Sequence, residues 1–489
     1  MPPADGYAFG PYRLDLRARR LLRGDDRIDL PEHQFDLLAT LVRHAGTLLS
    51  KDELITAAWG DVAVSDNSLA QGVSRIRRAL DEDPDRYVEN TRGRGYRFIA
   101  RVQPIETSLV DADLNAMVAP HRVFMDGRAA LESLGRDEIL RARDDFARIV
   151  HHHPHEAGFH VGLANACLFS FEATRADAHP DLDALRLAVT HAREACRLCP
   201  DEGEHWVTLG LALVRTGARD EGLATIRRGV SLDPENWRHL FRLAYVSWGE
   251  ECLVVARRTQ KRMPGSPMAR WIAASVYIAR LALAEAEREL DAGLVAMAAA
   301  AAAGAQTPVA TPGVASRLSA VGLNWLKGLV LFARGAHDEA LVLWRRELAL
   351  EGSGHIYARE IAANAWSAIG ADHLLRGDPA SARAAFAQAV SRVPHHPMSR
   401  AGLAILDNTA LDPRPSGPLA ASFDEVMAWA AVLVARGDVA GAVALVAKAL
   451  AEAPAGNAGW RVPVEPLLRV HEHLDAWAPV LALLRQRAM

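Results

Sequence analysis

Residues 66–80 place amide, hydroxyl and guanidinium side chains along one side of a predicted helix. Four apolar side chains recur at spacings of four, three and four residues: Leu69, Val73, Ile76 and Leu80. This spacing puts them on one face of an α-helix. The opposite face carries polar side chains and no acid: Asn67, Gln71, Ser74, Arg75 and Arg78. Such groups can hydrogen-bond to base edges and phosphates when a helix lies in a major groove.

A β-hairpin is predicted over residues 87–102. Aromatic and β-branched residues flank a turn at 91–95, which holds two glycines together with Arg92 and Arg94. A helix followed by a basic hairpin is the winged-helix arrangement, in which the hairpin lies at the minor groove. The simpler alternative is a solvated helix followed by an ordinary hairpin. The helix, the basic turn and the sequence Gly95-Tyr96-Arg97-Phe98 together favour the winged helix.

These residues also carry a resemblance to a known family. The pattern D-x-S-L-x-Q-x-V-S-R-I-R-R-A-L at 66–80, followed by R-G-x-G-Y-R-F at 92–98, resembles the DNA-binding domain of OmpR/PhoB-type response regulators. Within that family it is similar to the regulators without a receiver domain, of the ToxR, CadC and HilA kind. Residues 30–38 and 49–60 resemble the first two helices of the family, so the resemblance covers about residues 8–103.

The resemblance implies an α+β winged helix-turn-helix domain at residues 1–103 that binds double-stranded promoter DNA. It places a small sheet at 8–30, helices at 31–44 and 51–59, a recognition helix at 66–80 in the major groove and a wing at 87–102 at the minor groove. The residues expected to bind DNA are Asn67, Ser68, Gln71, Ser74, Arg75, Arg78, Arg92 and Arg94. Dimerisation on DNA is an expectation by analogy.

Three details of this stretch qualify the resemblance. The family often has arginine where this chain has Asn67, so guanine recognition is not expected there. Gly72 lies in mid-helix, at a cost of about 1 kcal/mol relative to alanine, for which close packing on the wing is one explanation. The loop before the helix contains Asp61, Val62, Ala63 and Val64. In the family such a loop either touches RNA polymerase or only shapes the turn, and both alternatives stay open.

From His121 onward the sequence predicts a large all-α solenoid of tetratricopeptide-like (TPR-like) repeats. The clearest copy has the repeat's characteristic residues at Trp366, Ile369, Gly370, Gly377, Ala382, Phe386, Ala389 and Pro394. A second copy contains Trp206, Gly210 and Gly217, with Gly222 and Gly229 in place of the usual alanines. Further copies lie near Gly328 and Leu433. Small residues let the two helices of a pair approach, and a large residue fills the gap to the next pair.

The predicted domains are residues 1–103, a linker at 104–120, and the repeats at 121–489. Breaks in the repeats are expected near 298–316, where the sequence is low in complexity, and near 407–420, which holds three prolines. The tryptophans of the repeats, among them Trp237, Trp325, Trp344 and Trp429, are expected to fill the core, with a ligand cage as the alternative.

The composition fits a multidomain globular protein rather than a general polyanion binder. The chain has 489 residues and a net charge of −4. Its four cysteines are too sparse for a disulfide framework, which indicates a reducing compartment. No signal peptide is evident, and the alanine-rich stretch at 294–305 is shorter than a membrane span. We therefore expect a cytoplasmic, nucleoid-associated bacterial protein without a membrane partner.

The sequence lacks the familiar catalytic and metal-binding patterns. No phosphate-binding loop, nucleophile elbow, metalloprotease motif or dinucleotide fingerprint is present. The histidines at 151–155 and the pair Cys196 and Cys199 are better explained as an exposed turn and buried thiols than as a zinc site. We expect no enzyme activity, cofactor or metal.

The leading hypothesis is a sequence-specific transcriptional regulator whose repeats bind a protein partner, oligomerise or sense a ligand. Although the family belongs to phosphorelay systems, this chain has no expected phosphoacceptor domain. The alternative is a TPR scaffold or adaptor whose winged helix binds protein and not DNA.

Overall fold

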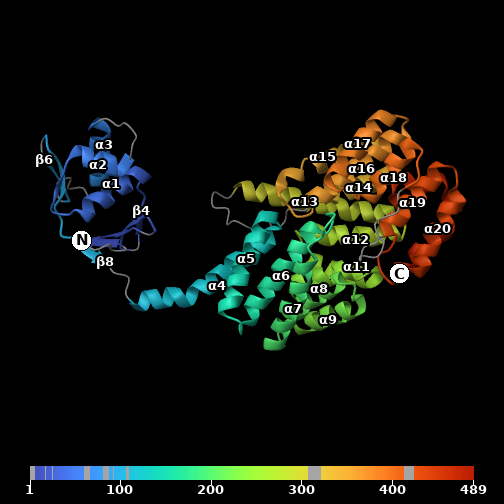
Figure 1. The fold of residues 1–489 in the computed structure, drawn as a ribbon, viewed down its shortest axis with the longest axis horizontal. Coiled ribbons are helices and arrows are strands. Elements are labelled where there is room, and N and C mark those ends of the chain that lie inside the picture. The colour runs from blue at the N-terminus through green and yellow to red at the C-terminus, as the bar shows by residue number, and fades with distance from the viewer. Residues whose placement is uncertain are drawn as a thin grey trace. The chain divides into compact units, whose positions relative to one another are not determined.

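The computed structural model describes residues 6–16, 18–24, 26–59, 66–80, 87–91, 93–105, 109–306, 321–411 and 423–489. The chain divides into two compact units, residues 1–119 and residues 120–489 (Figure 1). Each unit has its own hydrophobic core. Within the described residues, no helix combines the length and the apolar character that crossing a membrane requires.

Among its described residues, the N-terminal unit combines two antiparallel sheets with three complete helices. Its elements are β1 (Gly6–Phe9), β2 (Tyr12–Asp15), β3 (Arg20–Arg23), β4 (Asp26–Ile28), α1 (Glu32–Arg43), β5 (Leu48–Leu49), α2 (Lys51–Trp59), α3 (Asp66–Leu80), β6 (Val88–Thr91), β7 (Gly95–Phe98) and β8 (Gln103–Ile105). The strand orders are β4-β3-β2-β1-β8 and β5-β7-β6. The expected winged-helix class, with its small N-terminal sheet and its hairpin, is confirmed.

Two strands of this unit were not predicted. The last strand, β8, pairs with β1, so that Gly6 lies opposite Ile105. Residues expected to begin a linker therefore complete the N-terminal sheet, and the rest of the expected linker includes the start of α4. The two-residue strand β5 pairs with β7 and attaches the hairpin to the helices, with Leu49 opposite Tyr96. Such short strands leave little periodicity in the sequence.

The second unit is built from helices in sequential pairs, as the sequence predicts. The helices are α4 (Leu109–Ser133), α5 (Arg136–His152), α6 (Ala157–Thr174), α7 (Leu182–Leu198), α8 (Gly203–Arg215), α9 (Arg219–Leu232), α10 (Trp237–Val246), α11 (Gly249–Arg262), α12 (Pro267–Ala279), α13 (Leu283–Gln306), α14 (Leu323–Ala333), α15 (His337–Leu348), α16 (Ala358–Leu375), α17 (Pro379–Arg392), α18 (Pro397–Asp407), α19 (Phe423–Ala435), α20 (Val439–Glu452) and α21 (Leu474–Arg487). Short 3₁₀ segments are η2 (Glu351–Ser353), η3 (Val462–Val464), η4 (Pro466–Leu468) and η5 (Val470–Glu472).

The same glycine turn joins the helices of four pairs. The four glycines have positive φ angles: Gly217 at 95°, Gly335 at 85°, Gly377 at 79° and Gly437 at 83°. In the α16–α17 turn, the Gly377 N–H donates to the Leu374 carbonyl at 3.1 Å, and the next N–H donates to the His373 carbonyl at 2.9 Å. This turn satisfies carbonyl groups at the end of the first helix of each pair. The turn glycines expected from the repeat pattern are thus confirmed.

Glycines also allow the paired helices to pack closely. A Cβ atom on Gly370 would lie 2.7 Å from the buried Phe386 ring, and one on Gly328 would lie 2.3 Å from Trp344. Between α8 and α9 the contact is backbone to backbone, because a Cβ on Gly210 would lie 2.5 Å from the Gly222 carbonyl oxygen. The glycines that replace the usual alanines in this pair therefore bring the two helices closer together.

Two expectations for the repeats need correction. Helix α13 continues to Gln306, so residues 298–306 are helical and are not the start of a break; the rest of that expected break, to residue 316, lies outside the described residues. The second expected break begins after α18, but most of it also lies outside the described residues.

The tryptophans are not all in the core. Trp325 and Trp344 are buried, whereas Trp429 is 38% exposed and Trp237 lines a pocket.

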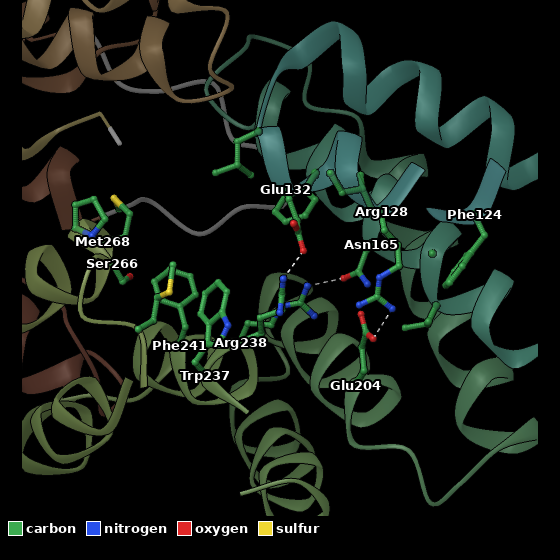
Figure 2. Close-up of a pocket in the computed structure, with 18 residues that line it drawn as sticks. Phe124, Arg128, Glu132, Asn165, Glu204, Trp237, Arg238, Phe241, Ser266 and Met268 are labelled. Atoms are coloured by element: carbon green, nitrogen blue, oxygen red, sulfur yellow. Dashed lines mark hydrogen bonds and ion pairs between the residues drawn. The ribbon is translucent and has the colours of Figure 1, made fainter. Parts of the chain in front are cut away.

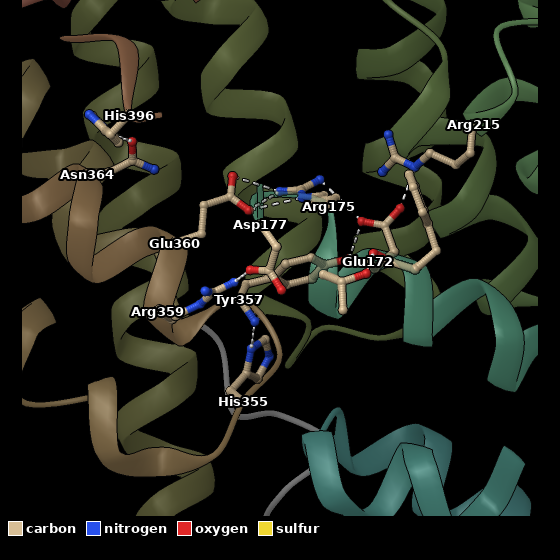
Figure 3. Close-up of polar contacts among 12 residues, drawn as sticks. Glu172, Arg175, Asp177, Arg215, His355, Tyr357, Arg359, Glu360, Asn364 and His396 are labelled. Atoms are coloured by element: carbon tan, nitrogen blue, oxygen red, sulfur yellow. Dashed lines mark hydrogen bonds and ion pairs between the residues drawn. The ribbon is translucent and has the colours of Figure 1, made fainter. Parts of the chain in front are cut away.

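Polar contacts join parts of the repeat unit that are far apart in sequence (Figure 3). Arg175, just after α6, makes two 3.0 Å hydrogen bonds to Glu360 of α16 and one of 3.2 Å to Glu172. The hydroxyl of Tyr357 donates to Glu172 at 3.1 Å, and Arg215 also pairs with Glu172. Although burial lowers the pKa of Arg175, Glu360 and Glu172 raise it above its ordinary value. These groups form a partly buried, charge-matched tie between α6 and α16.

Candidate DNA-binding surface

Helix α3 has the two faces that its sequence predicts. Its apolar side chains are at most 2% exposed: Leu69, Val73, Ile76 and Leu80. They pack in one core with residues of α1 and α2 and with the strands of the hairpin. Because this face is fully buried, α3 has a fixed orientation in the domain. The polar side chains are consequently held on the outer side.

The polar face of α3 is exposed along most of the helix. Gln71, Ser74, Arg75 and Arg78 are exposed, and Ser68 is half-buried. Within this set, Arg78 Nη2 donates to Ser74 Oγ at 3.5 Å. Asn67 lies in the first turn of α3, but its side chain lies outside the described part of the chain. The exposed face is therefore polar and basic, with donors and acceptors directed away from the core.

Gly72 packs against the other helices, and not against the wing as the sequence suggested. A Cβ at this position would lie 3.2 Å from Leu37 Cδ2 of α1 and 3.4 Å from the ring of Trp59 of α2. The glycine lets α3 approach both helices, which accounts for a residue that is otherwise unfavourable in mid-helix. This contact fixes the depth at which α3 sits in the domain.

The wing is held by a close backbone contact. Gly95 has φ +141°, and a Cβ there would lie 1.9 Å from the Leu49 carbonyl oxygen. Only glycine lets β7 approach β5 so closely. The turn before it is closed by the Arg94 N–H, which donates to the Thr91 carbonyl at 2.9 Å, and the Arg94 side chain is exposed. Arg92 lies outside the described residues.

Arg77 has a role that the sequence did not reveal. Its Nη2 donates to the Val88 carbonyl of β6 at 2.6 Å, and the side chain is half-buried. This bond joins α3 to the wing, so Arg77 positions the two elements relative to each other. Its type and spacing resemble those of Arg75 and Arg78, and no pattern in the sequence distinguishes it. The loop Asp61, Val62, Ala63 and Val64 is outside the described residues.

Comparison with known families identifies the domain that contains α3 and the wing. Residues 25–98 match the family described as "Transcriptional regulatory protein, C terminal". They form an OmpR/PhoB-type DNA-binding domain. The matched stretch includes α3 and the hairpin β6–β7, and the family is one of transcriptional regulators and not a class of enzymes. The resemblance read from the sequence is therefore confirmed for this domain.

Curated relatives match the same domain. The chain is 38% identical over 93 residues to the transcriptional regulator HilA of Salmonella typhimurium, which is 19% of this chain and 17% of HilA. It is 36% identical over 90 residues to the phosphate regulon regulatory protein PhoB of Klebsiella pneumoniae, which is 18% of this chain and 39% of PhoB. The DNA-binding domain of E. coli CadC is 27% identical over 21% of this chain and 97% of that domain, with a TM-score of 0.20. The chain thus spans less than a fifth of the length of HilA and two fifths of PhoB, and the similarity is confined to the OmpR/PhoB-type domain.

Proposed function

We propose that this protein is a sequence-specific transcriptional regulator whose α3 lies in the major groove of promoter DNA. Gln71, Ser74, Arg75 and Arg78 contact bases and phosphates, with Asn67 and Ser68 at the start of the helix. Arg94 and Arg92 of the wing contact the adjacent minor groove or its phosphates. The observation that carries the proposal is the exposed, acid-free face of α3 inside an OmpR/PhoB-type domain.

The rest of the molecule acts as the regulatory part in this proposal. The TPR-like unit binds a protein partner, forms an oligomer or senses a ligand, and thereby changes how much of the promoter is occupied. The loop 61–64 contacts RNA polymerase, and the protein works in the cytoplasm. The family membership of the N-terminal domain supports these assignments by analogy.

The decisive experiment is selection of binding sites from a random pool of double-stranded DNA with the full chain. A recovered motif is then titrated at several salt concentrations. Replacing Arg75 and Arg78 together by alanine should cost about 1–3 kcal/mol of binding free energy for each arginine that reads a base. The decline of affinity with salt should become shallower by about one unit for each phosphate that the variant no longer neutralises.

A matched control is available on another element of the same unit. Arg27 of β4 is exposed and pairs with Asp29 at 3.1 Å, so Arg27→Ala removes a surface arginine outside α3 and the wing. The control should bind the motif as the unaltered protein does. If no motif is recovered, or if both variants weaken binding equally, α3 does not read DNA. The scaffold alternative, in which the winged helix binds protein, would then replace the proposal.

A further inference from the structure

The repeat unit contains a pocket of about 490 Å³ that the sequence did not predict (Figure 2). Its lining comes from α4, α6, α8 and α10 and from the start of α12. The volume lies within the range of sites that enclose a small molecule. All these residues belong to the second unit, so the pocket is formed without the DNA-binding domain.

Most of the pocket wall is apolar and rich in aromatic rings. Its large apolar side chains include Phe124, Leu131, Phe169, Trp237, Phe241 and Met268. Two of the aromatic residues, Trp237 and Phe241, lie beside each other on one side in Figure 2, with Phe124 at the far end. Trp237 was expected in the repeat core and is instead half-buried at this wall. Such a wall favours a ligand with a flat or flexible apolar body.

One arginine in the pocket has neutral partners. Arg242 of α10 donates from Nη1 to Thr208 Oγ1 and from Nη2 to Asn165 Oδ1, both at 2.8 Å. The Thr208 hydroxyl in turn donates to Asn165 at 3.3 Å. Among the described residues, no carboxylate oxygen lies within 4.0 Å of the Arg242 guanidinium. The guanidinium is therefore held in a fixed orientation but its charge is not matched by direct contact.

The other charged groups leave the pocket with an excess of positive charge. Arg128 pairs with Glu204 at 2.9 Å, and Arg238 pairs with Glu132. Three arginines thus line the pocket against two glutamates. Burial lowers the pKa of Arg242, and Arg128 and Arg238 lower it further against the opposing effect of Glu204. An anion next to Arg242 would relieve this imbalance.

A neighbouring hollow has the opposite charge balance. It has a volume of about 450 Å³ and shares Phe124, Arg128 and Glu204 with the first pocket. Its remaining charged lining includes Glu156 and Glu202, so glutamates outnumber the single arginine there. An anionic ligand would accordingly choose the pocket that contains Arg242.

We infer that this pocket binds a small organic carboxylate with an apolar, aromatic-sized body. The carboxylate accepts hydrogen bonds from Arg242, whose planar guanidinium suits that geometry. The apolar body lies against Trp237 and Phe241. This assignment takes up the ligand-sensing role of the repeat unit and in that respect rests on the proposed function. The binding itself does not depend on DNA.

The test measures binding to the full chain by isothermal titration calorimetry without DNA. The probes are 2-naphthylacetate, 4-phenylbutyrate and decanoate, each compared with its own neutral amide. At least one acid should bind about tenfold or more tightly than its amide, because a hydrogen bond between two charged groups is stronger than one to a neutral group. If none of the three acids binds more tightly than its amide, the proposal is wrong. This comparison needs no variant and therefore does not depend on folding.

Variants then locate the site. Arg242→Met should abolish the preference for the acid, whereas Arg242→Lys, which keeps the charge, should retain part of it. Arg227→Gln is the matched control, because Arg227 pairs with Glu251 on the surface at 2.7 Å and does not line the pocket. An unchanged preference in Arg242→Met would place the acid elsewhere and overturn the assignment. The assignment to a small carboxylate would also be overturned if a pentapeptide ending in phenylalanine binds at least tenfold more tightly than every acid.

A separate experiment measures whether the bound acid changes the affinity for DNA. If the acid binds and the selected DNA motif is also bound, saturating acid should change the affinity for the motif at least threefold in one direction. Binding of the acid without any motif would contradict the proposed function and leave the pocket assignment intact. If a DNA motif is bound but no acid is, the pocket assignment is wrong and the proposed function is unaffected.

Discussion

The outer face of α3 and the pocket of the repeat unit differ in how their residues are distributed along the sequence. The face of α3 comes from fifteen consecutive residues, and the apolar side of the same helix fixes its direction. The pocket draws its lining from Phe124 through Met268, across several helices. A surface made by one helix can be read from periodicity, whereas a surface made by many requires their packing. The packing in both units depends on a few glycines.

The largest effect is expected from Gly95→Ala in the wing. The new Cβ would lie 1.9 Å from the Leu49 carbonyl, at a φ of +141°. We expect a loss of about 4 kcal/mol in the stability of the N-terminal unit and loss of DNA binding. Gly93→Ala is the control: its φ is +76° and nothing lies within 4 Å, so it should cost about 1 kcal/mol. Hydrogen exchange of the amides of β6 and β7 measures the stability loss in both variants. Similar exchange rates in Gly95→Ala and Gly93→Ala would mean that the close approach of Gly95 to Leu49 does not stabilise the wing.

The corresponding change in the repeat unit is Gly210→Ala. Its Cβ would lie 2.5 Å from the Gly222 carbonyl oxygen and would force α8 away from α9. We expect a loss of about 3 kcal/mol in urea unfolding, followed by tryptophan fluorescence, and weaker acid binding because α8 carries Glu204 and Thr208. The turn variant Gly217→Ala, with open space around its Cβ, should cost only about 1 kcal/mol. If Gly210→Ala weakens DNA binding as much as it weakens acid binding, the face of α3 and the pocket are not independent of each other.

A buried histidine should make the stability of the repeat unit depend on pH. Burial, together with Arg461 and against Asp424, lowers the pKa of His396 to about 4. The unfolded chain, with a histidine pKa of about 6.5, therefore binds more protons between these values, and stability falls as pH drops from about 6.5 to about 4. His396 contributes about 2–3 kcal/mol to this loss.

The matched variant for this effect is His396→Asn. The His396 Nδ1 accepts from the Ser399 N–H at 3.2 Å at the start of α18, and asparagine can provide the same cap. Urea unfolding at pH 7 and pH 4.5 should show a smaller difference in the variant than in the unaltered chain. An equal difference in both would mean that His396 does not control the pH dependence.

The smallest effect is expected from Arg77→Lys, which removes the bond from α3 to the Val88 carbonyl. The domain should lose about 1 kcal/mol, and the exchange of β6 amides should quicken more than that of β7. Lysine keeps the positive charge, so the salt dependence of DNA binding should stay the same. Arg77→Gln removes the charge, and a shallower salt dependence in that variant would instead make Arg77 a direct phosphate contact.

The two units differ in how much of their structure could be predicted from the sequence, and the reasons are physical. The apolar spacing of α3 determined its buried face, and Gly217 and Gly377 marked turns of the repeats. The strand β8 was missed because Gln103–Ile105 is too short to show alternation. The role of Arg242 was missed because its partners Thr208 and Asn165 are 34 and 77 residues away. The proposed DNA contacts all stay predictions: Asn67, Ser68, Gln71, Ser74, Arg75, Arg78, Arg92 and Arg94. The proposed contact of the loop 61–64 with RNA polymerase also stays a prediction.

The tie between α6 and α16 has a consequence for how the repeat unit unfolds. In an open array each repeat touches only its neighbours, so the ends can fray while the middle stays folded. Here Arg175 bonds to Glu360 across 185 residues, and the Gly354 carbonyl accepts from the Arg136 N–H. Separating the chain between α13 and α14 would take Glu360 and Tyr357 away from the buried Glu172 and the half-buried Arg175, which is unfavourable. The repeat unit should therefore melt in one cooperative step, and neither half should persist as a stable fragment.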